Sequence, residues 1–310
     1  MRLAALSVDL DEIPCYHAIH GLPEPTGSDA HAVYDRAVSR FTDLFARMGV
    51  PATFFAIGRD LARPAAAERI RALDALGHEL GNHTQNHCYD LVRLDIATMR
   101  SEVSDGAASI RRVTGRAPAG FRAPGYTTSD ALLRIVGDSG ARYDSSVFPC
   151  PAYYAAKTAA IAWIGARGRT SHSIVDTPNV LRAPADPYSI GEPYWRIGAD
   201  DRLIELPIGV TRGPRLPFIG TSVMLAGPER ARWFTRAIVG RPLVNLELHG
   251  LDLLSANDDS LHALAKHQRD LLGSVERKLA TLESVVNELR NADYRFVTLR
   301  DAADAFRAPP

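Results

Sequence analysis

The stretch that decides the fold lies near the start of the chain: residues 3–11 read LAALSVDLD, a small and apolar run that ends on two acids. A continuous apolar run that stops at polar residues is typical of a strand buried on both faces of a parallel sheet. Asp9 and Asp11 are two residues apart, so on a strand their side chains lie on the same face. Two carboxylates this close repel each other unless a positive charge lies nearby.

Strand-like and helical segments alternate over most of the chain. Runs of strand length occur at residues 3–9, 52–57, 78–83, 119–123, 141–147, 203–208, 243–248 and 295–299, and helical periodicity at residues 32–48, 65–76 and 94–114. The alternation predicts an α/β fold with a parallel sheet, and the number of strands favours a distorted (β/α) barrel of seven or eight strands. No glycine-rich phosphate loop follows a strand, which argues against a nucleotide-binding doubly wound fold.

We expect one domain over residues 1–310, with a long irregular insertion at residues 149–220 that is rich in proline and aromatic residues. A connection of this length usually covers a site rather than merely joining two elements. We therefore expect it to build the wall that faces the substrate, with Trp195 as a stacking surface. The alternative is a purely structural cover over the barrel.

The amino-acid composition indicates which binding partners and which cellular compartment to expect for the protein. The chain carries 36 basic and 36 acidic side chains, which does not suggest nucleic acid or an anionic membrane as its main partner. Its three cysteines lack a CxxC spacing, and no stretch reads as a secretory signal or as the roughly 20 apolar residues of a membrane span. We expect a cytoplasmic protein without a transmembrane segment, in an oligomeric state that the sequence does not specify.

Polar residues recur at the ends of the expected strands, where catalytic groups lie in α/β barrels. These residues are Asp9, Asp11, His83, His87, Arg122, Asp144, Glu205 and His249. His83 and His87 are spaced i, i+4, and on a turn of helix both imidazoles would face one divalent metal ion. Two histidines and one aspartate leave positions open for water and substrate, as a catalytic metal site requires.

Four motifs in this order resemble the polysaccharide deacetylase family, also known as the NodB homology domain. They are SVDLD at residues 7–11, HTQNH at 83–87, FRAPGY at 121–126 and LELHG at 246–250. The resemblance implies that a divalent metal, most often Zn²⁺, is held by Asp11, His83 and His87. It also implies three catalytic roles: the base is Asp9, its partner is Arg122, and the general acid is His249.

The sequence departs from the family in two places. Leu10 separates the two opening acids, which are adjacent in most of the family, and the Asp-x-x-Asp-Trp motif that orients the catalytic histidine is not evident. Asp144, Glu205 and Asp252 are candidates for that role, and Asp144 is preferred because it ends a strand. We expect the substrate to be contacted by Gly125, Tyr126, Glu205 and Trp195.

These residues predict a metal-dependent hydrolase that removes an acetyl or formyl group from the nitrogen of an amino sugar or a related small or lipid-linked saccharide. The substrate, the acyl group and the identity of the metal are not specified. A cyclic amide or ureide hydrolase of the allantoinase kind is the alternative enzyme. A non-catalytic carbohydrate-binding protein is the alternative of another class, and the presence of both Asp9 and His249 disfavours it.

Overall fold

The computed structural model describes residues 2–25, 27–175, 177–199 and 202–307. The strands of these residues form one sheet: β1 Leu3–Asp9, β2 Ala52–Ala56, β3 Glu79–Asn82, β4 Gly120–Phe121, β5 Tyr143–Asp144, β6 Tyr188–Ser189, β7 Ile204–Glu205, β8 Leu243–His249 and β9 Arg295–Phe296. Their order is β6-β7-β5-β4-β3-β2-β1-β8, and β9 pairs with the start of β1. The pairs are parallel except β6 with β7, which are antiparallel.

The sheet curls toward a barrel because the chain beyond β7 returns to β8. Gly209 donates its N–H to the carbonyl of Asn245, and Ile219 forms a parallel bridge with Glu247. This confirms the predicted α/β fold with a distorted barrel. The prediction missed β6, a two-residue strand whose pairing with β7 depends on the loop around it rather than on an apolar pattern.

β1 lies between β2 and β8 in the sheet, and each of its seven residues is buried. Small and apolar side chains suit this position because both faces of the strand are covered. Its register with the neighbouring strands is the fact that matters for function, since Asp9 stands opposite Phe55 of β2 and His249 of β8. The carboxyl ends of parallel strands meet at one edge, so polar residues from distant motifs arrive there together.

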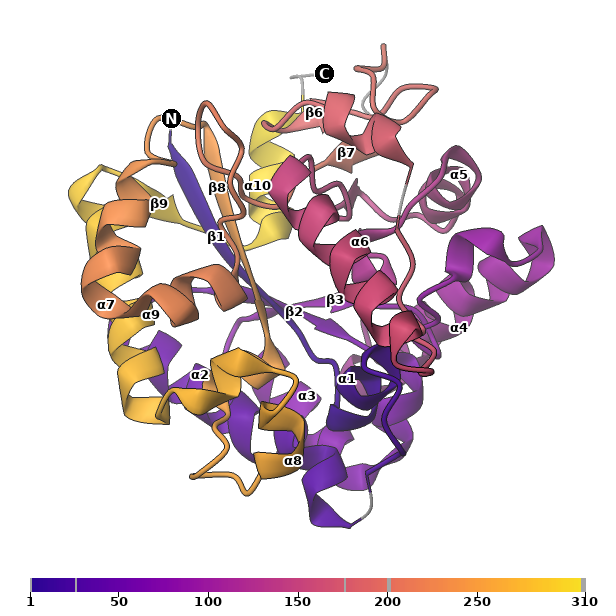
Figure 1. The fold of residues 1–310 in the computed structure, drawn as a ribbon. Coiled ribbons are helices and arrows are strands. Elements are labelled where there is room, and N and C mark those ends of the chain that lie inside the picture. The colour runs from indigo at the N-terminus through magenta and orange to yellow at the C-terminus, as the bar shows by residue number, and fades with distance from the viewer. Residues whose placement is uncertain (1, 26, 176, 200–201, 308–310) are drawn as a thin grey trace.

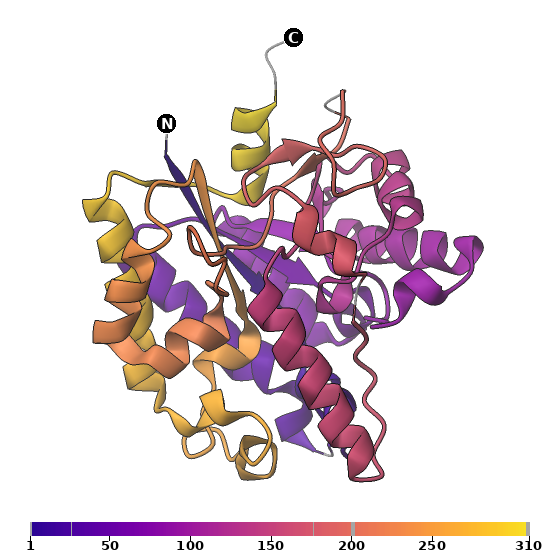
Figure 2. The ribbon, with the colours of Figure 1, turned by 45° about the horizontal axis from the view of Figure 1, so that its top comes forward.

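Helices cover the sheet on its outer side (Figures 1 and 2). They are α1 Ile13–Ile19, α2 Val38–Met48, α3 Pro64–Ala75, α4 Ile96–Thr114, α5 Asp130–Asp138, α6 Pro151–Ala166, α7 Gly220–Arg236, α8 His262–Ala265, α9 Val275–Asn291 and α10 Leu299–Phe306. A π-helical turn, Val33–Ala37, leads into α2. None of the described helices is long and apolar enough to cross a membrane.

The insertion at residues 149–220 is not irregular throughout, and that part of the prediction was wrong. Residues 151–166 form α6, which begins with Pro151 at its first turn and is rich in alanine, the strongest helix former. Figure 2 shows α6 crossing in front of the sheet. The segment that follows α6 reaches α1, because the N–H of His172 donates to the carbonyl of Ala18.

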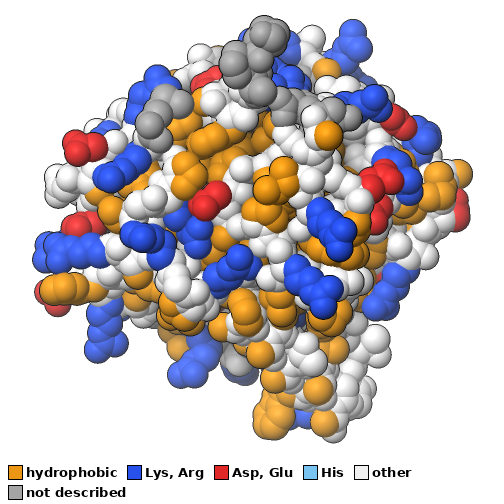
Figure 3. Space-filling view, turned by 90° about the horizontal axis from the view of Figure 1, so that it is seen from above, with side chains coloured by type: hydrophobic (Ala, Val, Ile, Leu, Met, Phe, Trp, Pro, Cys, Tyr) orange, Lys and Arg blue, Asp and Glu red, His pale blue; other side chains and the backbone are white. Residues whose placement is uncertain are grey.

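The two ends of the sheet differ in character. Figure 3 looks onto the end where β1 begins, and there the Lys and Arg side chains are spread among apolar and uncharged surface. The buried acids and histidines of the motifs lie at the opposite end, where β1 and β8 finish. The fold therefore brings the buried acids and histidines of the motifs together at the carboxyl edge of the strands.

Candidate active site

Asp11, His83 and His87 converge on one point. One Asp11 oxygen, Oδ1, lies 3.3 Å from Nε2 of His83 and 3.2 Å from Nε2 of His87. Ligating atoms of the three residues all lie within 4.8 Å of one another, and each residue is buried. Two ligand atoms at about 2.1 Å from a tetrahedral zinc ion stand roughly 3.4 Å apart, so the spacing suits such an ion.

The hydrogen bonds around this set also fit a cation. Nδ1 of His83 lies 2.7 Å from the carbonyl of Arg122; the carbonyl accepts, so the proton sits on Nδ1 and the lone pair of Nε2 faces Asp11. Among the described residues, Asp11 Oδ1 and both ring nitrogens of His87 are buried without a hydrogen-bond partner. Leaving such groups unpaired is costly, and a divalent metal would satisfy them.

The two histidines are not on a helix, so the predicted helical turn was wrong. Residues 83–87 form a loop in which Thr84 and His87 have positive φ values of 67° and 58°. The side chain of buried Asn82 accepts a hydrogen bond from the N–H of Thr84, whose own hydroxyl accepts one from the N–H of His87. These side-chain bonds hold the backbone in a turn that brings both imidazoles to one side.

Asp9 stands beside the metal set but has a different partner. Its Oδ1 accepts a hydrogen bond of 2.6 Å from Nη1 of Arg122, a guanidinium with no exposed surface. Its Oδ2 lies 3.9 Å from Nε2 of His83. Because a buried guanidinium must be neutralised, Asp9 remains a carboxylate and faces the metal set with its second oxygen.

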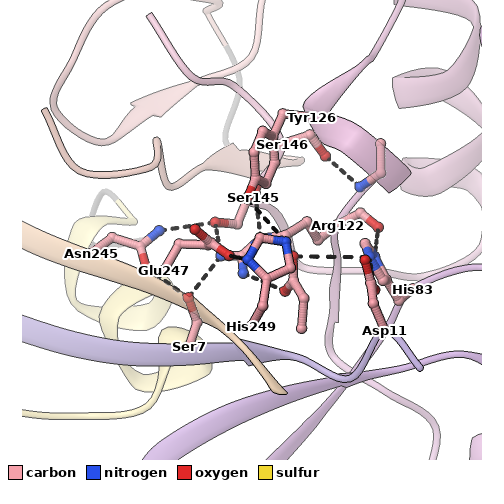
Figure 4. Close-up of polar contacts among 12 residues, drawn as sticks. Ser7, Asp11, His83, Arg122, Tyr126, Ser145, Ser146, Asn245, Glu247 and His249 are labelled. Atoms are coloured by element: carbon pink, nitrogen blue, oxygen red, sulfur yellow. Dashed lines mark hydrogen bonds and ion pairs between the residues drawn. The ribbon is translucent and has the colours of Figure 1, made fainter. Parts of the chain in front are cut away.

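A buried hydrogen-bond network fixes Arg122 (Figure 4). Its Nη2 donates to the hydroxyls of Ser7 and Ser145, and its Nε donates to the carbonyl of Ser145. The side chain of Asn245 links both serines, since its oxygen accepts from Ser7 and its nitrogen donates to Ser145. Residues on or directly after four strands, β1, β4, β5 and β8, therefore determine where the charge next to Asp9 lies.

His249 ends β8, beside Asp9, and its partner is an acid that the sequence reasoning missed. Nδ1 of His249 lies 2.9 Å from Oε1 of Glu247, which has no exposed surface (Figure 4). Burial disfavours the charged imidazole, but the Glu247 carboxylate outweighs it and raises the pKa of His249 well above its ordinary value. The prediction that Asp144 orients His249 was wrong.

The signal for Glu247 was present in the motif LELHG. Glu247 and His249 are two residues apart on a strand, so they share a face, as Asp9 and Asp11 were expected to do. A second candidate, Asp252, also contacts His249, but through the main chain: its Oδ2 accepts from the N–H of His249 at 2.8 Å. Burial raises the pKa of Asp252 to about 7.

Asp144 and Glu205 instead form a buried acid pair with each other. Asp144 accepts hydrogen bonds from the N–H and hydroxyl of Ser146, and Glu205 accepts one from the N–H of Val147. Burial and the neighbouring Asp144 raise the pKa of Glu205 well above its usual range, so it carries the proton that the pair shares. Glu205 has no exposed surface, and the prediction that it contacts substrate was wrong.

A cavity of about 320 Å³ opens beside the metal set, which is the size of a small-ligand pocket. Both Gly125 and Tyr126 line it, as predicted, and the Tyr126 hydroxyl lies 3.4 Å from Nε2 of His249. The helix α6 contributes one wall through Tyr153, Ala156, Lys157 and Ala160. Most of the insertion's lining residues therefore lie on the helix, and Ser173 and Ile219 line the cavity from outside it.

Trp195 is not among the described residues that line this cavity, so its predicted role as the substrate-facing aromatic was wrong. It packs edge-on against Tyr194, with ring centroids 5.1 Å apart, at the edge of a second hydrophobic cluster. This packing removes part of the apolar surface of Trp195 from water, which stabilises the loop against the cluster.

Trp195→Ala is therefore expected to affect stability rather than substrate binding. We expect the free energy of unfolding to fall by about 2 kcal/mol, less than for a fully buried tryptophan. The KM should stay within about twofold of the wild-type value, because the side chain does not reach the cavity. Tyr153→Ala is the matched comparison, since Tyr153 does line it. Urea titration and steady-state kinetics measure both, and a raised KM for Trp195→Ala alone would contradict the assignment.

Glu247→Gln is expected to lower the pKa of His249, because the amide no longer stabilises the imidazolium. A general acid works only while protonated, so the alkaline limb of the kcat profile should move to lower pH, by about one unit or more. Glu205→Gln is the control: it replaces a fully buried acid that is already neutral and should leave the limb in place. An unmoved limb in Glu247→Gln would show that another group controls His249.

Comparison with known proteins agrees with this fold. Residues 29–143 match the family model described as "Polysaccharide deacetylase". A chitooligosaccharide deacetylase of Bradyrhizobium sp. (strain ANU 289) is 41% identical over 92 residues, which is 29% of this chain and 41% of the relative. A chitin deacetylase of Pestalotiopsis sp is 31% identical over 103 residues, 33% of this chain and 34% of the relative. The chain thus spans less than half the length of these curated relatives.

Solved structures share the fold over nearly the whole chain. A putative polysaccharide deacetylase from Mycobacterium smegmatis has a TM-score of 0.61 at 18% identity, covering 98% of this chain and 90% of that one. A family 4 carbohydrate esterase (CE4) pseudoenzyme from Bacillus anthracis has a TM-score of 0.53 at 12% identity, covering 99% and 67%. Since a pseudoenzyme shares it, the fold alone does not prove activity.

The described residues form an α/β fold that is shared with a putative polysaccharide deacetylase. Residues 29–143 match the polysaccharide deacetylase family, and the chain has the NodB-like fold that its four motifs predicted.

Proposed function

We propose that this chain is a metal-dependent hydrolase that removes an acetyl or formyl group from the nitrogen of an amino sugar or a related small or lipid-linked saccharide. One observation carries the proposal. The carboxylate of Asp9 lies opposite the imidazole of His249 on the adjacent strand. Both lie next to Asp11, His83 and His87, the three residues that could hold a metal ion. Amide hydrolysis needs this combination: a base for the attacking water and an acid for the leaving amine.

The roles of the chain's own residues follow from their partners. Asp9, held as a carboxylate by Arg122, accepts a proton from the attacking water through the oxygen that faces the metal set. His249, charged because of Glu247, donates its Nε2 proton to the departing amine. A divalent metal bound by Asp11, His83 and His87 would act as a Lewis acid that polarises the acyl carbonyl and acidifies water.

Two features of the cavity suit a small acylated sugar. Its aromatic lining, Tyr16, Tyr89, Tyr126 and Tyr153, offers faces on which a sugar ring stacks. Its polar groups include Lys157, which donates to the carbonyl of Gly125, and the acids Asp252 and Asp270. Polar groups of this kind fix the orientation of hydroxyl-bearing ligands.

The proposal is tested by release of acetate and formate from a panel of N-acylated amino sugars, with the protein loaded with Zn²⁺. We expect turnover of at least one N-acyl sugar, strictly dependent on added metal, and its loss in His249→Gln. Hydantoin-type cyclic amides belong in the same panel, because their cleavage would favour the ureide hydrolase instead. Metal binding without turnover of either class would indicate a pseudoenzyme and overturn the proposal.

A further inference from the structure

The cavity ends away from the metal set where three separate segments meet. Ile19 at the end of α1, Ser173 beyond α6 and Gln268 beyond α8 all line it. The segments hold one another in place. Nε2 of His20 lies 3.3 Å from the side-chain oxygen of Gln268, and the N–H of His172 donates to α1.

Each of these three lining residues has a histidine as its neighbour in the chain: His20, His172 and His267. The rings of His20 and His267 lie face to face at a tilt of 31°, with centroids 5.4 Å apart. Arg169 joins them from the chain beyond α6, packed so close to Gly21 that a Cβ there would lie 3.1 Å from the Arg169 Cβ. We name His20, Arg169, Lys266 and His267 the basic rim of the cavity.

Basic side chains gather at the rim. The side chains whose charges act on His267 are Arg169, Lys266, Arg167 and His17, all of them basic. Between Ser146 and Val175 the sequence holds no acidic residue, in a chain whose formal net charge is zero. Two buried acids, Asp252 and Asp270, line the same cavity, and Asp270 faces Lys278.

Arg169 and Lys266 both act electrostatically on His267, and an anion bound beside them would offset the repulsion between their like charges. Burial, together with the neighbouring basic groups, lowers the pKa of both His20 and His267, so these rings act as neutral N–H donors rather than as cations. The rim groups are half buried or exposed, and they adjoin the lining residues Ile19, Ser173 and Gln268 without being among the described residues that line the cavity. Guanidinium and imidazole N–H groups are the donors that bind phosphate oxygens best.

We infer that the basic rim binds a phosphate or diphosphate group carried by the substrate, at the far end of the cavity from the acyl group. The inference rests on the proposed function and narrows it to acylated amino sugars that bear a phosphate ester. The proline-rich part of the insertion plays no part in this, because the binding groups come from α1, the end of α6 and the α8 segment.

Binding of inorganic diphosphate tests the rim without any turnover. The imidazole NMR signals of His20 and His267 in the metal-loaded protein report on the rim, and that of His249 reports on the catalytic end. We expect saturable shifts of His20 and His267, and an affinity at least about tenfold weaker in Arg169→Gln, the loss of one charged contact. Arg196→Gln, an exposed arginine outside the rim, is the control and should bind as wild type.

Shifts confined to His249, or equal affinity in Arg169→Gln, would overturn the inference while leaving the proposed function intact. A kinetic pair then ties the rim to the substrate: Arg169→Gln should raise KM about tenfold for an acylated amino sugar 1-phosphate and leave KM for the unphosphorylated sugar unchanged. An equal rise for both sugars counts against it.

The phosphate can belong to a soluble sugar phosphate or to a lipid, and vesicles separate the two sources. Cosedimentation with phosphatidylcholine vesicles that contain phosphatidic acid, lost in Arg169→Gln, identifies a phosphate presented at a lipid surface. Binding of soluble diphosphate without cosedimentation identifies a soluble phosphate ester. Failure of both probes to bind overturns the inference.

Discussion

Asp9→Asn is expected to lower kcat by roughly 10²–10⁴-fold while the protein keeps its metal, because Asp9 is placed as the base and not as a ligand. Its Oδ1 is engaged by Arg122 at 2.6 Å, and its other oxygen lies 3.9 Å from His83, beyond the contacts that join Asp11 to both histidines. An asparagine keeps the shape and the acceptor for Arg122 but has no basic oxygen. Kinetics and elemental analysis of the same preparation measure the two quantities together.

The same substitution has a cost in stability that must be separated from catalysis. Asp9 is the carboxylate that neutralises the fully buried Arg122, so Asp9→Asn leaves an uncompensated guanidinium and should lower the free energy of unfolding by about 3–5 kcal/mol. Ser7→Ala is the matched control, since it removes another acceptor of Arg122 without touching the base. It should cost only about 1–2 kcal/mol and retain most of kcat.

Loss of metal from Asp9→Asn would contradict the assignment of Asp9 as the base rather than as a metal ligand. Ligating atoms of Asp9, Glu247 and His249 also lie within 4.8 Å of one another, so these residues form a second set with the composition of a metal site. In the proposed mechanism they act instead as base, charge partner and acid. Metal content that depends on Asp9 and Glu247, but not on His87, would show that the two sets have been assigned the wrong way round.

The sequence predicted the fold well because one physical signal repeats along the chain. The longest parallel strands, β1, β2 and β8, are largely apolar, and β1 and β8 end at polar motifs, so these strand ends and their motif residues could be located together. What the sequence could not show is the register. That Asp9 stands opposite His249 follows from the pairing of β1 with β8, which are separated by more than 230 residues.

The errors at the site come from side-chain partners that only the packed structure reveals. Asp144 ends a strand as Asp9 and His249 do, but Ser146 supplies it with local donors, which favours an inward acid pair with Glu205. Strand position alone could not separate this case from that of Glu247. The turn at His83 and His87 could not be predicted from the sequence either. It depends on hydrogen bonds through the side chains of Asn82 and Thr84 rather than on helix propensity.

His87→Ala is expected to abolish stable metal binding, because it removes one of three protein ligands from a set with no described replacement within reach. Loss of an outer-shell partner already weakens metal affinity by 10–100-fold, so loss of a direct ligand should exceed about 100-fold. Elemental analysis after dialysis, with competition against a chelator, measures the change. His262→Ala, an exposed histidine of α8, is the control and should retain about one metal per chain.

Stability provides a second readout that does not depend on activity. Asp11 Oδ1 and the ring nitrogens of His87 are buried without hydrogen-bond partners, so a cation that pairs them should stabilise the folded chain. At a free Zn²⁺ concentration about a thousandfold above the Kd, linkage adds about 4 kcal/mol to the free energy of unfolding. This increment should be present in the wild type and in Asp9→Asn, and absent from both Asp11→Asn and His87→Ala. Equal stabilisation of all four proteins by Zn²⁺ would mean that the metal binds elsewhere on the chain.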